Sequence, residues 1–344
     1  MTQATPVISA KNVWKLFGSN PKGYLQSMEP NRSFEDIRQD GYIAGVKDVS
    51  IDVGRGEMLV IMGLSGSGKS TLVRCFCRLH EITGGTIEVE GQDIMSLGQK
   101  QLIDLRRQKM GMVFQSFGLL PHRTVLDNVA FPLEMRGQDR HARRERALEV
   151  IELVGLSGRE DYFPRELSGG QQQRVGIARS LVIEPDIWFL DEPFSALDPL
   201  IRREMQDEFL RLQEMLGKTV VFITHDFDEA LRLADRIAIM KDGAVEQCAT
   251  PGEIVMNPAT EYVRKFTEDI DKARVVTAGS LAASSDVGTS ADGQALDAEA
   301  SIQSLARQIM NDSRDLMPVQ SKDGAPVGVI KRKDALDILL GAEG

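Results

Sequence analysis

A glycine-rich segment offers the backbone and side-chain groups that bind phosphate. Residues 63–70 fit the pattern G-x-x-x-x-G-K-[ST] and lie between a predicted strand and a predicted helix. Glycines let successive backbone N–H groups turn inward around phosphate oxygens, and the helix directs its positive N-terminus at the same anion. Lys69 would reach the β- and γ-phosphates, and the Ser70 hydroxyl would bind Mg²⁺. The expected nucleotide-binding residues are Gly63, Leu64, Ser65, Gly66, Ser67, Gly68, Lys69, Ser70 and Thr71.

Two carboxylates follow an apolar run that is typical of a buried strand. The run is Ile187–Leu190, and Asp191 and Glu192 come directly after it. At the end of a strand, Asp191 would hold Mg²⁺ through water. Glu192 is the candidate general base for an attacking water molecule. With the phosphate loop, this pair predicts nucleotide hydrolysis.

Three further polar residues complete a hydrolytic site. Gln115 could contact Mg²⁺ and the attacking water, His225 follows an apolar strand and could reach the γ-phosphate, and Asp198 follows Glu192 after a short turn. Each has a structural alternative: a surface-loop residue, a polar strand terminus and a helix N-cap, respectively. Their order along the chain favours the catalytic interpretation.

The elements that position these residues predict an α/β fold with a buried parallel sheet. Met58–Met62 is the strand before the phosphate loop, Ser70–His80 reads as a helix, and Val220–Ile223 is a further buried strand. Asp198 and Pro199 mark a helix start that Gly217 ends. The block from about 118 to 182 is rich in helical patterns and predicts a helical subdomain inserted into the core.

Composition excludes several classes of protein. The 344 residues carry a net charge of −10, which argues against non-specific nucleic-acid binding. Cys75, Cys77 and Cys248 give no disulfide framework and are expected to be thiols in a reducing cytosol. No apolar run approaches the length that spans a bilayer, and the N-terminus lacks a secretory signal. We therefore expect a cytosolic chain whose membrane role depends on a partner.

The C-terminal part predicts a second, small domain. Residues 276–300 are rich in Ala, Ser, Gly and Asp, which is linker composition. Residues 301–344 then predict a small α+β module with two helices and two strands around a turn at Lys322–Gly324. The expected organisation is a nucleotide-binding domain over 1–275, a linker over 276–300 and a module over 301–344.

Taken together, these motifs resemble the nucleotide-binding subunits of ATP-binding cassette (ABC) transporters. The resemblance covers about 7–268 and rests on six elements in the expected order: Gly63–Thr71 (Walker A), Gln115 (Q-loop), Leu167–Gln171 (signature), Ile187–Glu192 (Walker B and base), Ser195–Asp198 (D-loop) and His225 (H-loop). It implies a P-loop NTPase with a RecA-like core, an antiparallel β subdomain and an inserted helical subdomain. The implied cofactors are ATP and Mg²⁺.

The resemblance also implies a mechanism. Two copies of the chain would sandwich two ATP molecules, so that Ser168, Gly169, Gly170 and Gln171, together with Asp198, act on the site of the partner subunit. Glu192, His225 and Gln115 would be catalytic, and Ser70, Gln115 and Asp191 would hold the metal. Phe17 matches the aromatic residue that stacks on adenine, although Trp14 is an alternative.

Narrower similarities point to an importer of quaternary amines such as glycine betaine, choline or proline. They include Phe194–Arg202 and the long insertion 18–44, which alternatively is a plain surface loop with a short helix at Phe34–Gln39. The implied partners are integral-membrane permease subunits and a separate substrate-binding protein, with the chain peripheral on the cytoplasmic face of the inner membrane. The alternatives are another amine or amino acid as cargo, or a soluble ABC ATPase of DNA repair or translation.

The C-terminal module resembles a single cystathionine-β-synthase (CBS) unit, on the basis of Gly324, Val327–Ile330 and Asp334. Where a nucleotide-binding unit of this kind shows Ser or Thr before the acidic residue, this chain has Lys331. The ligand of this module remains open between a nucleotide, anionic lipid at the basic cluster 331–333 and a protein partner.

Overall fold

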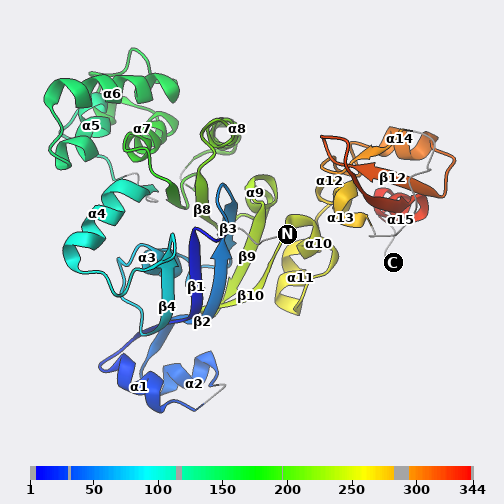
Figure 1. The fold of residues 1–344 in the computed structure, drawn as a ribbon, viewed down its shortest axis with the longest axis horizontal. Helices are drawn as coiled ribbons and strands as arrows, with labels where there is room; N and C mark the ends of the chain where they lie inside the picture. The colour runs from blue at the N-terminus through cyan, green and yellow to red at the C-terminus, as the bar shows by residue number, and fades with distance from the viewer. Residues whose placement is uncertain (1–4, 30–31, 114–117, 196, 283–293, 342–344) are drawn as a thin grey trace. The chain divides into compact units, whose positions relative to one another are not determined.

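The structure is a computed structural model that describes residues 5–29, 32–113, 118–195, 197–282 and 294–341. It divides into two compact units, Met1–Val245 and Glu246–Gly344, which are described separately. Figure 1 labels their helices and strands.

An antiparallel sheet forms the N-terminal layer of the first unit. Its strand order is β2-β1-β4-β5, with β1 Ile8–Phe17, β2 Ile43–Val53, β4 Gly84–Val89 and β5 Gln92–Asp93. Burial along β2 alternates between neighbouring residues, as expected of a sheet with one covered face. Phe17 ends β1 and pairs with Ile43, which places both residues at the sheet end nearest the insertion.

The insertion between β1 and β2 folds on a small core of its own. It forms α1 Pro21–Ser27 and α2 Phe34–Gln39, at the end of the sheet in Figure 1. Leu16, Ile37 and Ala44 are its buried residues, and Trp14 packs against them. The helix expected at Phe34–Gln39 is confirmed, and the apolar cluster shows that the insertion is more than a plain loop.

A mixed, largely parallel sheet carries the core of the first unit. Its order is β10-β9-β3-β8-β7-β6, with β3 Met58–Met62, β6 Met110–Val113, β7 Ile187–Asp191, β8 Thr219–Thr224, β9 Arg236–Lys241 and β10 Ala244–Ala249. Strand β10 begins in this unit and ends in the second. Every residue of β3, β7 and β8 is buried, because elements cover both faces of a parallel sheet. The flanking helices are α3 Lys69–Phe76, α4 Gln99–Lys109, α8 Pro199–Leu216 and α9 Phe227–Leu233.

The register of this sheet brings three functional segments to one edge. Met62 of β3 pairs with Thr224 of β8, and Asp191 of β7 pairs with Ile223. The chain leaves these parallel strands at their carboxyl ends, where ligands of open α/β sheets bind. The phosphate loop, the Asp191–Glu192 pair and His225 therefore emerge side by side.

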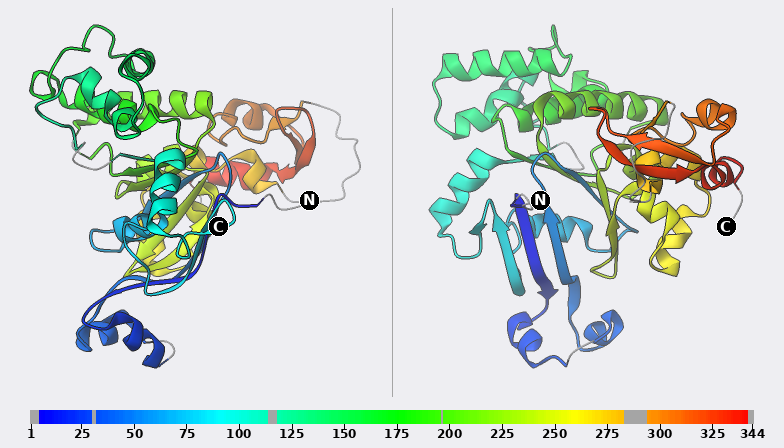
Figure 2. Two further views of the ribbon diagram at one scale, coloured as in Figure 1. Left: turned by 60° about the vertical axis from the view of Figure 1, so that its left-hand side comes forward. Right: turned by 45° about the vertical axis from the view of Figure 1, so that its right-hand side comes forward.

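The helical subdomain expected within the core lies between β6 and β7 along the chain. It consists of α5 Val125–Met135, α6 Arg140–Leu153, the 3₁₀ turn Pro164–Glu166 and α7 Gly169–Leu181. Figure 2 shows from two directions that these helices lie at the opposite end of the first unit from α1 and α2. The predicted fold class of a RecA-like core with antiparallel and helical additions is confirmed.

The second unit is a small α+β domain. It contains α10 Pro251–Met256, α11 Glu261–Thr267, α12 Lys272–Val275, α13 Ala278–Leu281, β11 Leu296–Asp297, α14 Ala306–Asn311, β12 Leu316–Gln320, β13 Pro326–Lys331 and α15 Arg332–Leu339. The sheet order is β11-β12-β13, with β11 parallel and β13 antiparallel to β12. The CBS likeness of this unit stays a prediction.

The prediction of a linker over 276–300 is wrong at both described ends of that segment. Val276, Ala278 and Leu296 are fully buried in the core of the second unit, with Met317 and Ile330. Its small, polar composition suggested a flexible chain, but a few apolar side chains are enough to anchor such a segment when a sheet lies beside it. Residues 283–293 lie outside the described part of the chain.

The basic cluster of the second unit is partly used within the fold. Arg332 donates from Nε to the carbonyl oxygen of Ile309 at 3.1 Å and from Nη2 to that of Met310 at 3.0 Å. It therefore satisfies carbonyl groups at the end of α14. Among the helices of the described residues, none is long and apolar enough to cross a membrane.

Candidate functional site

The phosphate loop connects β3 to α3 through backbone conformations that only glycine adopts readily. Gly68 has φ of +101°, and a Cβ atom there would lie 2.2 Å from the carbonyl oxygen of Gly45. No side chain fits this position. The loop therefore stays close to β2 and leaves its N–H groups at the start of α3 for an anion.

Lys69 lies over the same loop. Its ammonium donates to the carbonyl oxygens of Gly63 at 2.8 Å and Leu64 at 3.0 Å. Burial lowers the pKa of Lys69, and the nearby carboxylates of Glu192 and Asp191 oppose that shift. The Ser67 hydroxyl is buried with no hydrogen-bond partner among the described residues. An orphaned hydroxyl beside a buried ammonium fits the oxygen atoms of a bound phosphate chain.

Ser70 and Asp191 meet across the edge of the sheet. The Ser70 hydroxyl donates to Oδ1 of Asp191 at 2.9 Å. Burial raises the pKa of Asp191, which marks a carboxylate that lacks a full countercharge. Hydroxyl and carboxylate oxygens are the ligands that Mg²⁺ prefers, and the described residues hold no cluster of three or more His, Cys, Asp or Glu for another metal. Gln115, the third expected ligand, lies outside the described residues.

Glu192 is held in a strained backbone conformation at the end of β7. Its φ is +46°, and its N–H donates to the carbonyl oxygen of Ile223 at 3.0 Å. Its own carbonyl oxygen accepts from the Ser195 hydroxyl at 3.0 Å. The side chain keeps 19% of its surface exposed, so water can reach it. Nδ1 of His225 lies 3.2 Å from Oε2 of Glu192, which orients the carboxylate.

Phe17 provides an exposed aromatic surface near the phosphate loop. Its side chain is 38% exposed, His80 meets it edge to face at 5.8 Å, and the ammonium of Lys15 lies 4.7 Å from the ring centre. Burial, assisted by the charges of Lys15 and Arg74, lowers the pKa of His80. Trp14 packs against the core of the insertion instead. This favours Phe17 as the residue that stacks on a base.

Gly45 brings this aromatic surface next to α3. A Cβ atom on Gly45 would lie 2.8 Å from Cε2 of Phe17 and 2.9 Å from Cγ2 of Thr71. The ring and the start of α3 are therefore neighbours across a residue without a side chain. Sequence reasoning missed Gly45 because no strand was predicted there; a glycine inside a strand is a known sign of close approach.

The signature segment forms the N-terminus of α7. Ser168 accepts from the N–H of Gln171 at 3.3 Å, and Gln171 Oε1 accepts from the N–H of Ser168 at 3.0 Å, which together make a capping box. Ser168 and Gly169 are exposed, whereas Gly170 is buried. A Cβ atom on Gly170 would lie 2.8 Å from Cγ2 of Ile201, so α7 packs closely on the start of α8.

Asp198 is a helix N-cap, which was the structural alternative to its catalytic interpretation. Its carboxylate accepts from the N–H groups of Leu200 at 3.2 Å and Ile201 at 3.1 Å and so caps α8. The residue is also exposed, next to the exposed start of α7. Capping occupies one carboxylate oxygen and leaves the other for an external partner.

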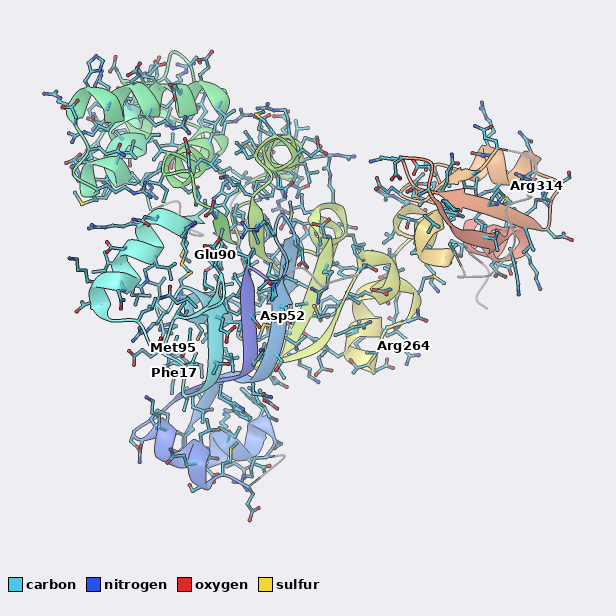
Figure 3. All side chains as sticks on the ribbon, viewed as in Figure 1. Phe17, Asp52, Glu90, Met95, Arg264 and Arg314 are labelled. Atoms are coloured by element: carbon cyan, nitrogen blue, oxygen red, sulfur yellow. The ribbon has the colours of Figure 1, made fainter. Side chains whose placement is uncertain are left out.

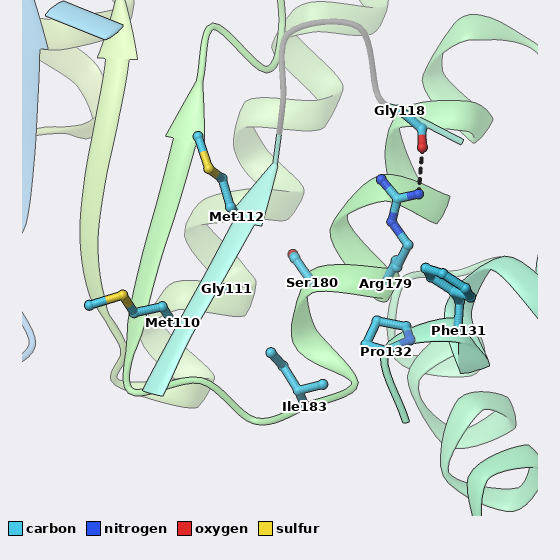
Figure 4. A pocket seen from close by; sticks show the side chains of 9 residues that line it. All are labelled: Met110, Gly111, Met112, Gly118, Phe131, Pro132, Arg179, Ser180 and Ile183. Carbon is cyan, nitrogen blue, oxygen red and sulfur yellow. Dashed lines mark hydrogen bonds between the residues drawn. The ribbon is translucent and has the colours of Figure 1, made fainter. Parts of the chain in front are cut away.

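A cavity of about 380 Å³ lies between the core and the helical subdomain. Its walls come from β6, α5 and α7, and include Met112, Phe131, Pro132 and Arg179 (Figure 4). Nη1 of Arg179 donates to the carbonyl oxygen of Gly118 at 2.7 Å, and burial lowers the pKa of Arg179. None of the sequence motifs marked this cavity.

Comparisons with known proteins agree with this geometry. Residues 46–195 match the family described as "ABC transporter". The chain is 78% identical over 338 residues to the trimethylamine N-oxide transport system ATP-binding protein TmoW of Ruegeria pomeroyi, covering 98% of each chain. It is 50% identical over 276 residues to the glycine betaine/proline betaine transport ATP-binding protein ProV of Escherichia coli, covering 80% of this chain and 69% of that protein.

A solved structure has the same fold over most of the chain. It is the dimeric structure of MJ0796, a bacterial ABC transporter cassette, with 36% identity and a TM-score of 0.59 over 71% of this chain and 98% of that chain. The family resemblance drawn from the motifs is confirmed. With the phosphate loop, the carboxylate pair and the signature helix in place, the chain belongs to the ABC transporter family as an ATP-hydrolysing, ATP-binding subunit.

Proposed function

We propose that this chain powers import of trimethylamine N-oxide or a closely related amine whose nitrogen is fully substituted. The observation that carries the proposal is the 78% identity to the TmoW protein, which spans 98% of both chains and so includes the second unit. The glycine betaine systems match at 50–51% over 80–82% of the chain. We therefore propose glycine betaine, choline and proline as the second candidates for the cargo.

Uptake of labelled compounds tests the cargo. Cells carrying either the wild-type chain or Glu192→Gln would be offered trimethylamine N-oxide, glycine betaine, choline and proline. Selective loss of trimethylamine N-oxide uptake in the variant supports the proposal. Loss of glycine betaine uptake alone would reassign the cargo, and unchanged uptake of all four would remove this cargo class.

The site supports magnesium-dependent hydrolysis in a dimer. Ser70 and Asp191 would hold Mg²⁺, which would neutralise charge on the phosphates, while Lys69 would bind the β- and γ-phosphates. Glu192 would take the proton of the attacking water, with His225 fixing its orientation. The N-termini of α7 and α8 hold Ser168, Gly169, Gly170, Gln171 and Asp198, of which Ser168, Gly169 and Asp198 are exposed. From there these residues would act on ATP held by a second copy.

Nucleotide titration and sedimentation test this arrangement. Lys69→Ala should lose ATP binding. The Ser168→Arg monomer should still bind ATP but should no longer dimerise with it, because a large cation would replace the exposed N-cap of α7. A Ser168→Arg protein that still dimerises with ATP would exclude the signature segment from the interface.

We propose that permease subunits dock at the cavity between β6, α5 and α7, and that a separate binding protein delivers cargo. The chain would then lie on the cytoplasmic face of the membrane through that contact. Phe131→Ala alters a cavity wall and should reduce co-purification with the permease at unchanged ATPase activity. Met135→Ala, an exposed residue of the same helix, is the control. Equal co-purification of both variants would place the docking site elsewhere.

A further inference from the structure

The guanidinium of Arg202 joins two loops at the hydrolytic end of the site. Nε donates to the carbonyl oxygen of Phe194 at 3.2 Å, and Nη2 donates to that of Leu197 at 3.1 Å. Nη1 lies 3.4 Å from Oδ2 of Asp226. Phe194 and Leu197 belong to the turn between Glu192 and Asp198, whereas Asp226 directly follows His225. One planar group therefore fixes the two loops to each other.

The first of these loops is tied to residues at both of its ends. At its start, the carbonyl oxygen of Glu192 accepts from the N–H of Ser195 at 3.3 Å. At its end, the N–H of Arg202 donates to the carbonyl oxygen of Asp198 at 2.9 Å. A displacement of Arg202 therefore acts on the position of Asp198 through the backbone as well as through the side chain.

The second loop is equally constrained. Oδ1 of Asp226 accepts from the N–H of Glu229 at 3.1 Å, which caps α9, and the N–H of Asp226 donates to the Thr224 hydroxyl at 3.0 Å. His225 lies between Thr224 and Asp226 and is 59% exposed. A movement of the His225 imidazole on binding a ligand would act directly on Asp226, its neighbour in the chain.

A small pocket of about 10 Å³ is lined by residues of both loops and by Arg202 itself. Glu192, Arg202, His225 and Glu229 are among the residues that line it. The pocket is about the size of one water molecule. Arg202 fixes the relative position of the two loops together with the contact between His225 and Glu192 and the bond from the N–H of Glu192 to the carbonyl oxygen of Ile223.

The energetics favour positioning over folding stability as the role of this contact. The side chains of Arg202 and Asp226 are 29% and 34% exposed, and ion pairs with that exposure contribute little to folding. The planar fork of an arginine does fix the direction of the groups it binds. Removing Arg202 should therefore leave a folded protein with a changed relation between the loops.

We propose that Arg202 is a positioning residue that couples the two ATP sites of the dimer. It transmits a rearrangement at His225 and Asp226 of one subunit to Asp198, which acts at the site of the other. This inference rests on the proposed function, because it requires a dimer in which Asp198 reaches the ATP of the partner subunit.

Phosphate release by the full-length protein, measured against ATP concentration, tests the coupling. The wild type should show a Hill coefficient above one, with two sites as its limit. Arg202→Gln should lower it to about one and reduce kcat roughly tenfold, while the affinity for a fluorescent ATP analogue changes less than about twofold. Arg202→Lys should restore part of the coupling, and Arg203→Gln, an exposed neighbour with the same charge change, should behave as wild type.

A second variant checks the path. Asp226→Asn should reproduce the effect of Arg202→Gln, and the double variant should add nothing to either single change. Unchanged cooperativity in Arg202→Gln overturns the inference. Parallel losses of ATP affinity, kcat and melting temperature also overturn it, because they assign a structural role. A wild type with a Hill coefficient of one also overturns the inference, because the two sites are then independent, whereas failure of Ser168→Arg to alter ATP-dependent dimerisation would count against the dimeric mechanism itself.

Discussion

Nδ1 of His225 lies 3.2 Å from Oε2 of Glu192, although the two residues are separated by 33 positions in the sequence. Each follows a buried parallel strand, and the pairing of Asp191 with Ile223 sets the two strand ends level. An imidazole beside a partly exposed carboxylate fixes the direction in which that carboxylate faces water. The pair thus has the geometry of a general base with an orienting neighbour.

Glu192→Gln should bind ATP and stall. Loss of a general base lowers the rate by about 10²–10⁴, while the phosphate loop and Lys69 are untouched. Phosphate release and nucleotide titration on the same preparation measure both effects. Glu214→Gln, an exposed position on α8, is the matched control. Turnover within a few-fold of wild type in Glu192→Gln would exclude this role.

Gly45→Ala should weaken ATP binding by disturbing the contact of Phe17 with the base rather than the contacts of the loop with the phosphates. The new methyl group would meet the Phe17 ring and Thr71, and stacking on a base is worth about 1–3 kcal/mol, so a loss of roughly tenfold in affinity is expected. Binding of inorganic tripolyphosphate should stay nearly unchanged. Gly98→Ala is the control, because its nearest contact is 3.5 Å away. Equal losses for ATP and tripolyphosphate would instead indicate a distorted loop.

The three thiols should differ sharply in reactivity. Cys75 and Cys77 are buried, and burial raises the pKa of each to about 12, so their thiolate forms are scarce at neutral pH. Cys248 is half-buried. A maleimide titration should label one thiol in the folded protein and three after denaturation. Rapid labelling of more than one in the folded state would contradict this burial.

Glu229→Gln should stabilise the protein at neutral pH. Burial raises the pKa of Glu229, although Gln206 donates to it at 2.9 Å. Because the folded pKa is the higher one, the stability contributed by the protonated carboxyl is complete below the unfolded value of about 4.3 and is lost as pH rises through the folded value. The amide never ionises, so the advantage of the variant should grow with pH.

Urea unfolding of wild type and variant from about pH 4 to about pH 8 measures this difference. Asp228→Asn, an exposed carboxyl on the same helix, is the control and should show no such trend. If the difference in free energy of unfolding between Glu229→Gln and wild type stayed constant across this pH range, ionisation of the Glu229 carboxyl would not destabilise the folded protein.

Local signals predicted much of this molecule. The strand and helix that flank residues 63–68, the N-cap at Asp198 and the Gly217 helix end each depend on a few neighbouring residues, and each is confirmed. Gly45 and Arg202 gain their roles from contacts with residues distant in the chain, so neither spacing nor composition marks them. The prediction for 276–300 was wrong for the opposite reason, because it relied on average composition. That average gives no indication that Val276, Ala278 and Leu296 are buried, since their burial depends on strands that come later in the chain.

The close contact between Gly68 and Gly45 has a consequence for which nucleotides can bind. Figure 3 marks Phe17 at the end of the antiparallel sheet, while the phosphate loop belongs to the parallel sheet. With backbone against backbone at Gly45, neither sheet can slide on the other without a clash. The distance between the Phe17 ring and the phosphate loop is thereby held constant. A ligand can contact both only if the distance between its base and its phosphates matches this separation, so the contact selects nucleotides by their length.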